Sequence, residues 1–404
     1  MYHLDTQFYF SCAAKSNGMR LLPHVREIDW TSRNEIYPCF TLLLSRMTYC
    51  LRLNFQPKLG TTEEIVESQR EELSLIRTIP ALSPHITDLT LSGVTGPWPN
   101  VRDTLQYLNV RLPLQRLELI DFPEMSAFVI CNISNLRNLC LMKCRSEPPF
   151  PSPLPSNCHG FLRLEELQIW VSRIEFITAL TNIMHNAPLR YLSIQSSHRS
   201  RGNFWKQVFD GIHNGIAHPS LAVVQITPTL GRSFVDEDPV TLEDMLGLLV
   251  FTNLTQLNLQ AMNGFDLDDE QMKTLVLALP RLKHLSLLSY LPQPNRPRMT
   301  FEGLHSVAQC CPKLESLGVM FDARNVVEHS GICNVNTESI NVSHSLVDDP
   351  ALVSAALLAT FPSLLQVVWS DYRDSSTEEL KALAFKWKEV NNLINLKHSN
   401  PSNS

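Results

Sequence analysis

A short apolar pattern recurs along almost the whole chain and constrains its fold more than any other feature. In this pattern an apolar residue is followed by two others, an apolar residue, one other and an apolar residue, as in LQRLEL at 114–119 and LKHLSL at 282–287. Thirteen copies occur, and their fourth residues stand about 28 residues apart on average. One copy is common in an amphipathic helix, but thirteen at a near-constant spacing indicate a structural repeat.

The fourth residue of each copy provides a common reference point for comparing the repeats. These residues are Ile28, Leu51, Leu89, Leu117, Leu139, Leu167, Leu192, Val224, Leu257, Leu285, Leu317, Ile340 and Val367. A period near 28 residues is typical of leucine-rich repeats. We therefore predict an α/β leucine-rich-repeat solenoid, or horseshoe, with an inner parallel sheet and outer helices. The fourth and sixth residues should face the core, and the third, fifth and seventh should face the concave surface.

Between the strands the apolar period changes to that of a helix. Residues 268–280 place Met272, Leu275, Leu277 and Leu279 after an acidic first turn, and residues 300–312 begin at Thr300, a suitable N-cap. A longer helix is expected over 61–79.

The ends of the chain differ from the repeats. We expect a lead-in over 1–20, the solenoid over 21–375, a capping helix over 376–396 with Trp387 on its apolar face, and a disordered tail over 397–404.

Composition excludes several classes of partner and compartment. The net charge is −6 and no run of five Lys or Arg occurs, so we do not expect nucleic acid as a partner. No stretch of 18 apolar residues predicts a membrane span, and the first residues do not resemble a signal peptide. The ten cysteines stand mostly inside apolar patterns, which favours a reducing compartment, either cytoplasm or nucleus.

No motif in the sequence predicts catalysis. Cys140 and Cys144 have no second pair at zinc spacing, and no phosphate-binding glycine loop or hydrolase signature occurs. Acidic runs such as 266–270 and 236–238 are better interpreted as helix starts and solvated loops than as metal or acid–base sites. We therefore expect a protein that is not an enzyme and that needs no metal or cofactor.

The concave face is the candidate site. Ile120, Met142 and Trp170 are the seventh residues of three successive repeats, so they should form one exposed apolar ladder. Exposed aromatic side chains beside charged ones are typical of protein interfaces. The residues that we expect to contact a protein substrate are Arg116, Glu118, Ile120, Met142, Glu166, Gln168, Trp170 and Tyr191.

Two alternatives remain for this ladder. The loop over 146–160 could fold over it and bury it, or the strand register could differ from the one assumed. Either would remove the surface as a binding site.

The stretch LLPHVREIDWTSRNEIYPCFTLLLSRMTYCLRLNF at 21–55 resembles the start of the repeat region in fungal F-box proteins, especially those of mushroom-forming fungi. The phrases ALPRLKHLSL, CCPKLESLGV and FPSLLQVVW, and the helix around Trp387, are similar to that family as well. The resemblance covers roughly residues 20–395 and rests on repeat motifs.

This resemblance implies substrate recognition within a ubiquitin ligase, because in that family an F-box binds a Skp-type adaptor and the repeats capture the substrate. The sequence has no LPxE-type F-box opening, and about 20 residues precede the first repeat. Adaptor binding is therefore expected only if an F-box lies upstream. A repeat-only scaffold or inhibitor unconnected to ubiquitin is the alternative.

Overall fold

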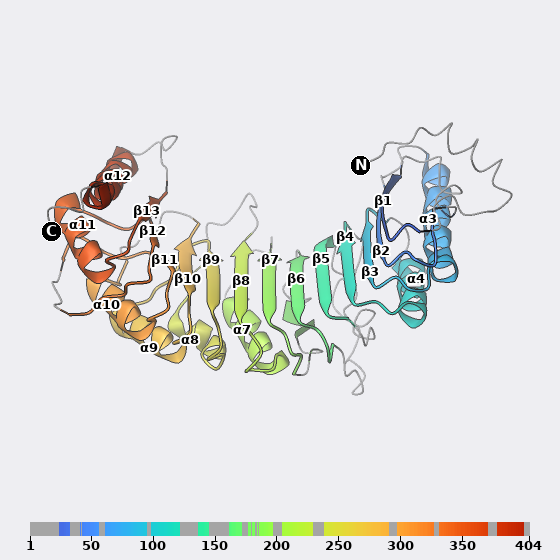
Figure 1. The fold of residues 1–404 in the computed structure, drawn as a ribbon, viewed down its shortest axis with the longest axis horizontal. Helices are drawn as coiled ribbons and strands as arrows, with labels where there is room; N and C mark the ends of the chain where they lie inside the picture. Colours follow the sequence, from blue (N-terminus) through green and yellow to red (C-terminus); the bar gives the residue numbers. More distant parts are fainter. Residues whose placement is uncertain are drawn as a thin grey trace. The chain divides into compact units, whose positions relative to one another are not determined.

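Figure 1 shows the fold of the chain in a computed structural model. The chain forms two compact units, Met1–Leu189 and Arg190–Ser404. The single repeat region expected over 21–375 therefore spans both units. The residues that the structure describes are 24–32, 41, 43–55, 61–94, 98–121, 136–144, 161–171, 177–178, 180–181, 184, 186–196, 204–228, 238–290, 297–326, 331–370 and 378–399. The predicted lead-in over 1–20 and the loop over 146–160 lie outside them.

Each copy of the sequence pattern forms one strand, and the strands follow one another in chain order. Unit 1 contains β1 (Glu27–Ser32), β2 (Cys50–Phe55), β3 (Asp88–Ser92), β4 (Arg116–Ile120), β5 (Asn138–Cys144) and β6 (Glu166–Val171). Unit 2 contains β7 (Tyr191–Ser196), β8 (Val223–Pro228), β9 (Gln256–Ala261), β10 (His284–Ser289), β11 (Ser316–Val319), β12 (Ser339–Ser343) and β13 (Gln366–Trp369). Within each unit, neighbouring strands pair in parallel.

The strand register matches the repeat register read from the sequence. In each unit the fourth residue of one copy pairs with the fourth residue of the next, as Leu117 does with Leu139 and Leu285 with Leu317. None of the thirteen is more than 7% exposed. Burying one such side chain contributes roughly 1.5–3 kcal/mol to the stability of the folded chain. A register shift of one residue would turn this side chain away from the core in every repeat.

The third, fifth and seventh residues point to the opposite side of the sheet, which we call the open face. On β4, for example, Leu117 and Leu119 are buried, Arg116 is exposed, and Glu118 and Ile120 are partly exposed. This alternation is the period of a strand that is buried on one side.

Helices follow many of the strands and pack on their buried side. Unit 1 has α3 (Thr62–Leu82) and α4 (Trp98–Arg111), and unit 2 has α7 (Phe204–Gly215), α8 (Leu242–Met245), the 3-10 turn η1 (Leu246–Leu248), α9 (Asp269–Ala278), α10 (Phe301–Cys310), α11 (Pro350–Thr360) and α12 (Glu378–Ser399). Met272 of α9 lines the same small core cavity as Leu287 and Val319, the sixth residues of their copies. The chain therefore has the architecture of an α/β leucine-rich-repeat solenoid.

The helices begin where the sequence offers a side chain that satisfies their first N–H groups. The predicted N-cap Thr300 is confirmed, because its hydroxyl accepts from the N–H of Glu302 (3.2 Å). Thr61, Thr241 and Asp268 form reciprocal capping boxes with the third residue of α3, α8 and α9. Such caps contribute roughly 1 kcal/mol each.

The structure adds two details to the predicted helices. On α9, Val276 is buried, whereas the adjacent Leu277 is 59% exposed. The terminal helix continues to Ser399, so the predicted tail over 397–404 begins as helix. Residues 400–404 lie outside the described residues.

The terminal helix α12 covers the last strand. Its buried residues are Trp387, Val390 and Ile394, whereas the apolar residues Leu380 and Leu383 are partly exposed. The side chain of Asn391 accepts a hydrogen bond from the N–H of Val367 on β13 (2.8 Å). One of the outward N–H groups of the last strand is thereby satisfied, which blunts an edge that could otherwise pair with another chain.

Candidate functional site

The open face of unit 1 brings together seven of the eight residues predicted to contact a protein. Arg116, Glu118 and Ile120 lie on β4, Met142 lies on β5, and Glu166, Gln168 and Trp170 lie on β6. The eighth, Tyr191, belongs to the first strand of unit 2 and is therefore considered with that unit.

Three apolar side chains stand side by side on this face. The register pairs Ile120 with Met142, and Met142 with Trp170, on three neighbouring strands. All three are partly exposed. Paired strands lie about 4.8 Å apart, so large side chains at one level cover part of each other. We call these three residues the apolar row.

Polar pairs between neighbouring strands lie beside the apolar row. Glu118 accepts a hydrogen bond from the hydroxyl of Thr90 (3.2 Å) and lies 3.8 Å from the guanidinium of Arg116. The amide of Asn138 donates to the carboxylate of Glu166 (2.5 Å). These pairs fix the orientation of side chains that would otherwise be free to rotate, and so lower the entropy cost of contacting a partner.

Cys140 lies in the middle of this face and is not a reactive thiol. Its side chain is buried and lies 3.9 Å from the amide oxygen of Gln168. Burial and the nearby carboxylate of Glu118 raise the pKa of the Cys140 thiol to about 11. At neutral pH the group is protonated, and a protonated thiol is a poor nucleophile and a poor metal ligand.

The open face of unit 2 has a different chemistry. The third, fifth and seventh residues of β7 to β10 include no Asp, Glu, Lys or Arg, and amides and hydroxyls are common among them. The hydroxyl of Tyr191 donates to the amide oxygen of Gln225 (3.1 Å). Gln225 in turn pairs with Asn258 on β9.

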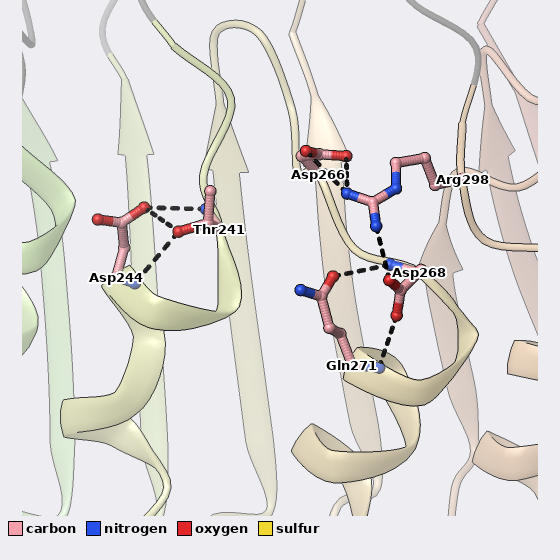
Figure 2. A network of polar contacts seen from close by, with 6 residues as sticks. All are labelled: Thr241, Asp244, Asp266, Asp268, Gln271 and Arg298. Carbon is pink, nitrogen blue, oxygen red and sulfur yellow. Dashed lines mark hydrogen bonds and ion pairs between the residues drawn. The ribbon is translucent and has the colours of Figure 1, made fainter.

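Acidic side chains gather where the strands of unit 2 lead into helices, and Figure 2 shows this network. The guanidinium of Arg298 lies 3.2 Å from the carboxylate of Asp266 and 2.6 Å from that of Asp268. Asp268 also caps α9 by accepting from the N–H of Gln271 (2.9 Å). The interpretation of this acidic run as a helix start is confirmed. Among the described residues, no group of His, Cys, Asp and Glu is placed to hold a metal ion.

Asp269, the next residue, joins two repeats. Its carboxylate accepts from the N–H and hydroxyl of Thr300 (2.7 and 2.8 Å) and from the N–H of Gly303 (2.9 Å). We expect Asp269→Ala to lower the free energy of unfolding by about 2 kcal/mol, because these donors lose their acceptor in a partly buried place. Urea unfolding followed by circular dichroism measures the change.

The matched control for Asp269 is Glu270→Ala, at an exposed position in the same helical turn. We expect that variant to change the free energy of unfolding by less than about 0.5 kcal/mol. Equal effects of the two substitutions would contradict a specific role of Asp269 in joining the repeats.

Comparison with known proteins gives structural likeness alone. No family model matches the chain, and no curated protein matches it. An internalin from Listeria monocytogenes is 12% identical with a TM-score of 0.44, covering 86% of this chain and 87% of that one. A leucine-rich-repeat protein from Leptospira interrogans is 14% identical with a TM-score of 0.45, covering 91% and 87%.

Two further findings bear on the sequence predictions. Among the described helices, none combines the length and the apolar character needed to cross a membrane. A polar groove in unit 2, which α12 and the first residues of the last strands form together, was not predicted from the sequence. Its signal was limited to two asparagines at helical spacing, Asn391 and Asn395, in an otherwise amphipathic helix.

Proposed function

We propose that this chain is a protein-interaction module and that the open face of unit 1 holds its partner. The observation that carries the proposal is the apolar row, Ile120, Met142 and Trp170, placed side by side on a sheet face that is otherwise polar and charged. Large apolar side chains within a polar surface are the usual anchors of protein interfaces.

The chemistry of this face favours binding over catalysis. The thiol of Cys140 is buried and protonated, and the carboxylate of Glu118 is already engaged by Thr90 and Arg116. Catalysis would need a nucleophile or base with a suitable pKa within reach of a partner group. An interface needs only shape, apolar area and satisfied polar groups.

The partner-binding role within a ubiquitin ligase is the finer form of this proposal. It is supported by the resemblance of residues 20–395 to the repeat region of fungal F-box proteins. If an F-box lies upstream, we expect the natural gene product to co-purify with a Skp-type adaptor, in the cytoplasm or nucleus. If the full gene product fails to retain the adaptor, the chain is better described as a scaffold or inhibitor unconnected to ubiquitin.

Replacing Trp170 tests the binding face directly. We expect Trp170→Ala to weaken capture of the protein partner about 30-fold, the loss typical of a central aromatic anchor. The melting temperature should fall by no more than about 4 °C, because the side chain is only partly buried. Affinity capture with quantitative mass spectrometry identifies partners retained by the wild type and lost by the variant, and titration then gives their affinities.

The matched control is Val110→Ala in the same unit, because Val110 lies on α4 and is 81% exposed. This variant should retain every partner. If Trp170→Ala retains the same partners as the control, the open face of unit 1 is not the interface. If Trp170→Ala instead lowers the melting temperature by much more than 4 °C, the side chain belongs to the protein core.

A further inference from the structure

A second surface, the polar groove, lies in unit 2 and is independent of the face proposed above. The groove has a volume of about 640 Å³, within the range of sites that hold ligands. Its lining residues are His284, Glu315, Ser316, Glu338, Ser339, Leu365, Gln366, Asn391 and Asn395.

The floor of the polar groove consists of the third residues of the last four repeats. The register pairs His284 with Ser316, Ser316 with Ser339, and Ser339 with Gln366. The side-chain amide of Gln366 donates to the hydroxyl of Ser339 (3.3 Å), so part of this floor is held in place. The floor therefore offers hydroxyl, amide and imidazole groups in one row, without a carboxylate, ammonium or guanidinium group.

The terminal helix α12 forms one wall. Asn391 and Asn395 are one helical turn apart, so both side chains point to the same side. The amide oxygen of Asn391 is taken by the N–H of Val367 (2.8 Å), which leaves its NH₂ group as a donor. This wall is preorganised to donate hydrogen bonds to a carbonyl oxygen.

Two carboxylates lie at the edge of the groove, and they differ in their side-chain partners. Glu315 lies 2.8 Å from the ammonium of Lys283 and 3.7 Å from the imidazole of His284. Among the described residues, no side-chain partner lies within hydrogen-bond or ion-pair distance of the Glu338 carboxylate. The lining includes no Lys or Arg. The groove therefore has an uncompensated negative charge at Glu338.

An exposed apolar side chain lines the same groove as this carboxylate. The N–H of Leu365 donates to the carbonyl oxygen of Glu338 (2.8 Å), which places the two residues at neighbouring strand starts. Leu365 is 52% exposed, although its neighbour Leu364 is fully buried. An apolar patch next to a lone carboxylate is the environment that a basic side chain fills, because its alkyl stem packs while its charged head forms an ion pair.

We propose that the polar groove binds an extended peptide segment of a protein partner through one arginine or lysine. The basic head group pairs with the carboxylate of Glu338, and the alkyl stem packs on Leu365. The amides of Asn391 and Asn395 hydrogen-bond to the peptide backbone. An acidic segment is excluded, because its carboxylate would approach Glu338 and Glu315.

Three synthetic hexapeptides test this assignment on the full chain. Each is an acetylated and amidated sequence of alanine and serine whose third residue is arginine, citrulline or glutamate. Citrulline keeps the shape of arginine without its charge. Methyl NMR reports the titration at Leu365, which lines the groove. We expect the arginine peptide to bind about tenfold more tightly than the citrulline peptide, and the glutamate peptide not to bind.

Two variants separate the groove from general electrostatics. Glu338→Gln should weaken the arginine peptide about tenfold and remove its advantage over citrulline. Glu379→Gln, at an exposed position on α12 outside the groove lining, should leave binding unchanged. Trp170→Ala, in the other unit, should leave it unchanged as well, so failure of the unit 1 proposal would not affect this result.

Several outcomes would overturn the proposal. Equal affinity for the arginine and citrulline peptides would show that charge at Glu338 does not select the ligand. An arginine peptide that binds without shifting the Leu365 methyl groups would place the contact elsewhere. Unchanged affinity in Glu338→Gln would exclude that carboxylate as the partner of the basic head group.

Discussion

Replacing Trp387 by alanine should lower the free energy of unfolding by about 4 kcal/mol, the largest effect that we expect of a single substitution in this chain. The side chain is fully buried, and its indole N–H donates to the carbonyl oxygen of Ser345 (2.7 Å). Its ring also packs against Phe321 in an edge-to-face arrangement, with centroids 6.1 Å apart. Removal therefore leaves a large cavity and an unsatisfied carbonyl group.

The control for this prediction lies on the same helix. Phe385 is also a large aromatic residue of α12, but it is 70% exposed. We expect Phe385→Ala to change the free energy of unfolding by less than about 0.5 kcal/mol. Chemical unfolding of both variants followed at 222 nm measures the difference. A loss below about 1 kcal/mol in Trp387→Ala would show that α12 does not cap the array through this side chain.

The reason for this large effect is the way that α12 closes the last repeat. Each inner repeat is covered by its neighbours on both sides, whereas the last one needs a separate cover. Trp387 belongs to a line of aromatic contacts in which Phe301 meets Phe321 (5.4 Å) and Phe321 meets the indole. The cap is therefore continuous with the repeat core.

The strand register at the fourth residues was predictable, because thirteen copies had to satisfy one periodicity together. The register shifts that follow Met142 and Asn341 were not predicted. A shift of one residue at Leu117 would turn Leu119 outward and Glu118 inward, and the same would occur in its neighbours. The fourth residues are accordingly paired and buried in both units. Repetition made this prediction stronger than any single copy could support.

The helix faces were less predictable, because one helix presents several apolar stripes. Leu277 and Val276 are adjacent apolar residues of α9, and tertiary packing selected Val276. On α12 the stripe at Leu380 and Leu383 is partly exposed, while Trp387 is buried. Which stripe is buried depends on how much surface of the neighbouring repeats the helix can cover. That surface is set by the tertiary structure and cannot be derived from a single sequence.

The candidate site also has features that were predictable from the sequence and features that were not. The order of Ile120, Met142 and Trp170 along one row followed from register, but their partial burial depends on side-chain conformations between strands. The polar groove could not be predicted, because Asn391 is 53 residues from Glu338 along the chain. They share one lining through the packing of α12 beside the last strands.

Acidification should destabilise unit 2 through His344, which is buried near the end of β12. Burial lowers the pKa of His344 from 6.5 to about 4, because the charged imidazolium is disfavoured inside the protein. The unfolded chain binds this proton near pH 6.5, whereas the folded chain resists it until about pH 4. The stabilisation is therefore complete above pH 6.5 and is lost as the pH falls to 4.

The expected loss across this window is about 3 kcal/mol, because one unit of pKa corresponds to about 1.4 kcal/mol. Urea unfolding at intervals from pH 7 to pH 4 measures it, and His344→Gln isolates the contribution of this residue. The free energy of unfolding should fall more steeply with decreasing pH in the wild type than in the variant, because unfolding of the wild type takes up about one additional proton. His85→Gln, at an exposed position, should retain the wild-type slope. Parallel curves for the wild type and His344→Gln would show that this imidazole is protonated equally in the folded and unfolded chain.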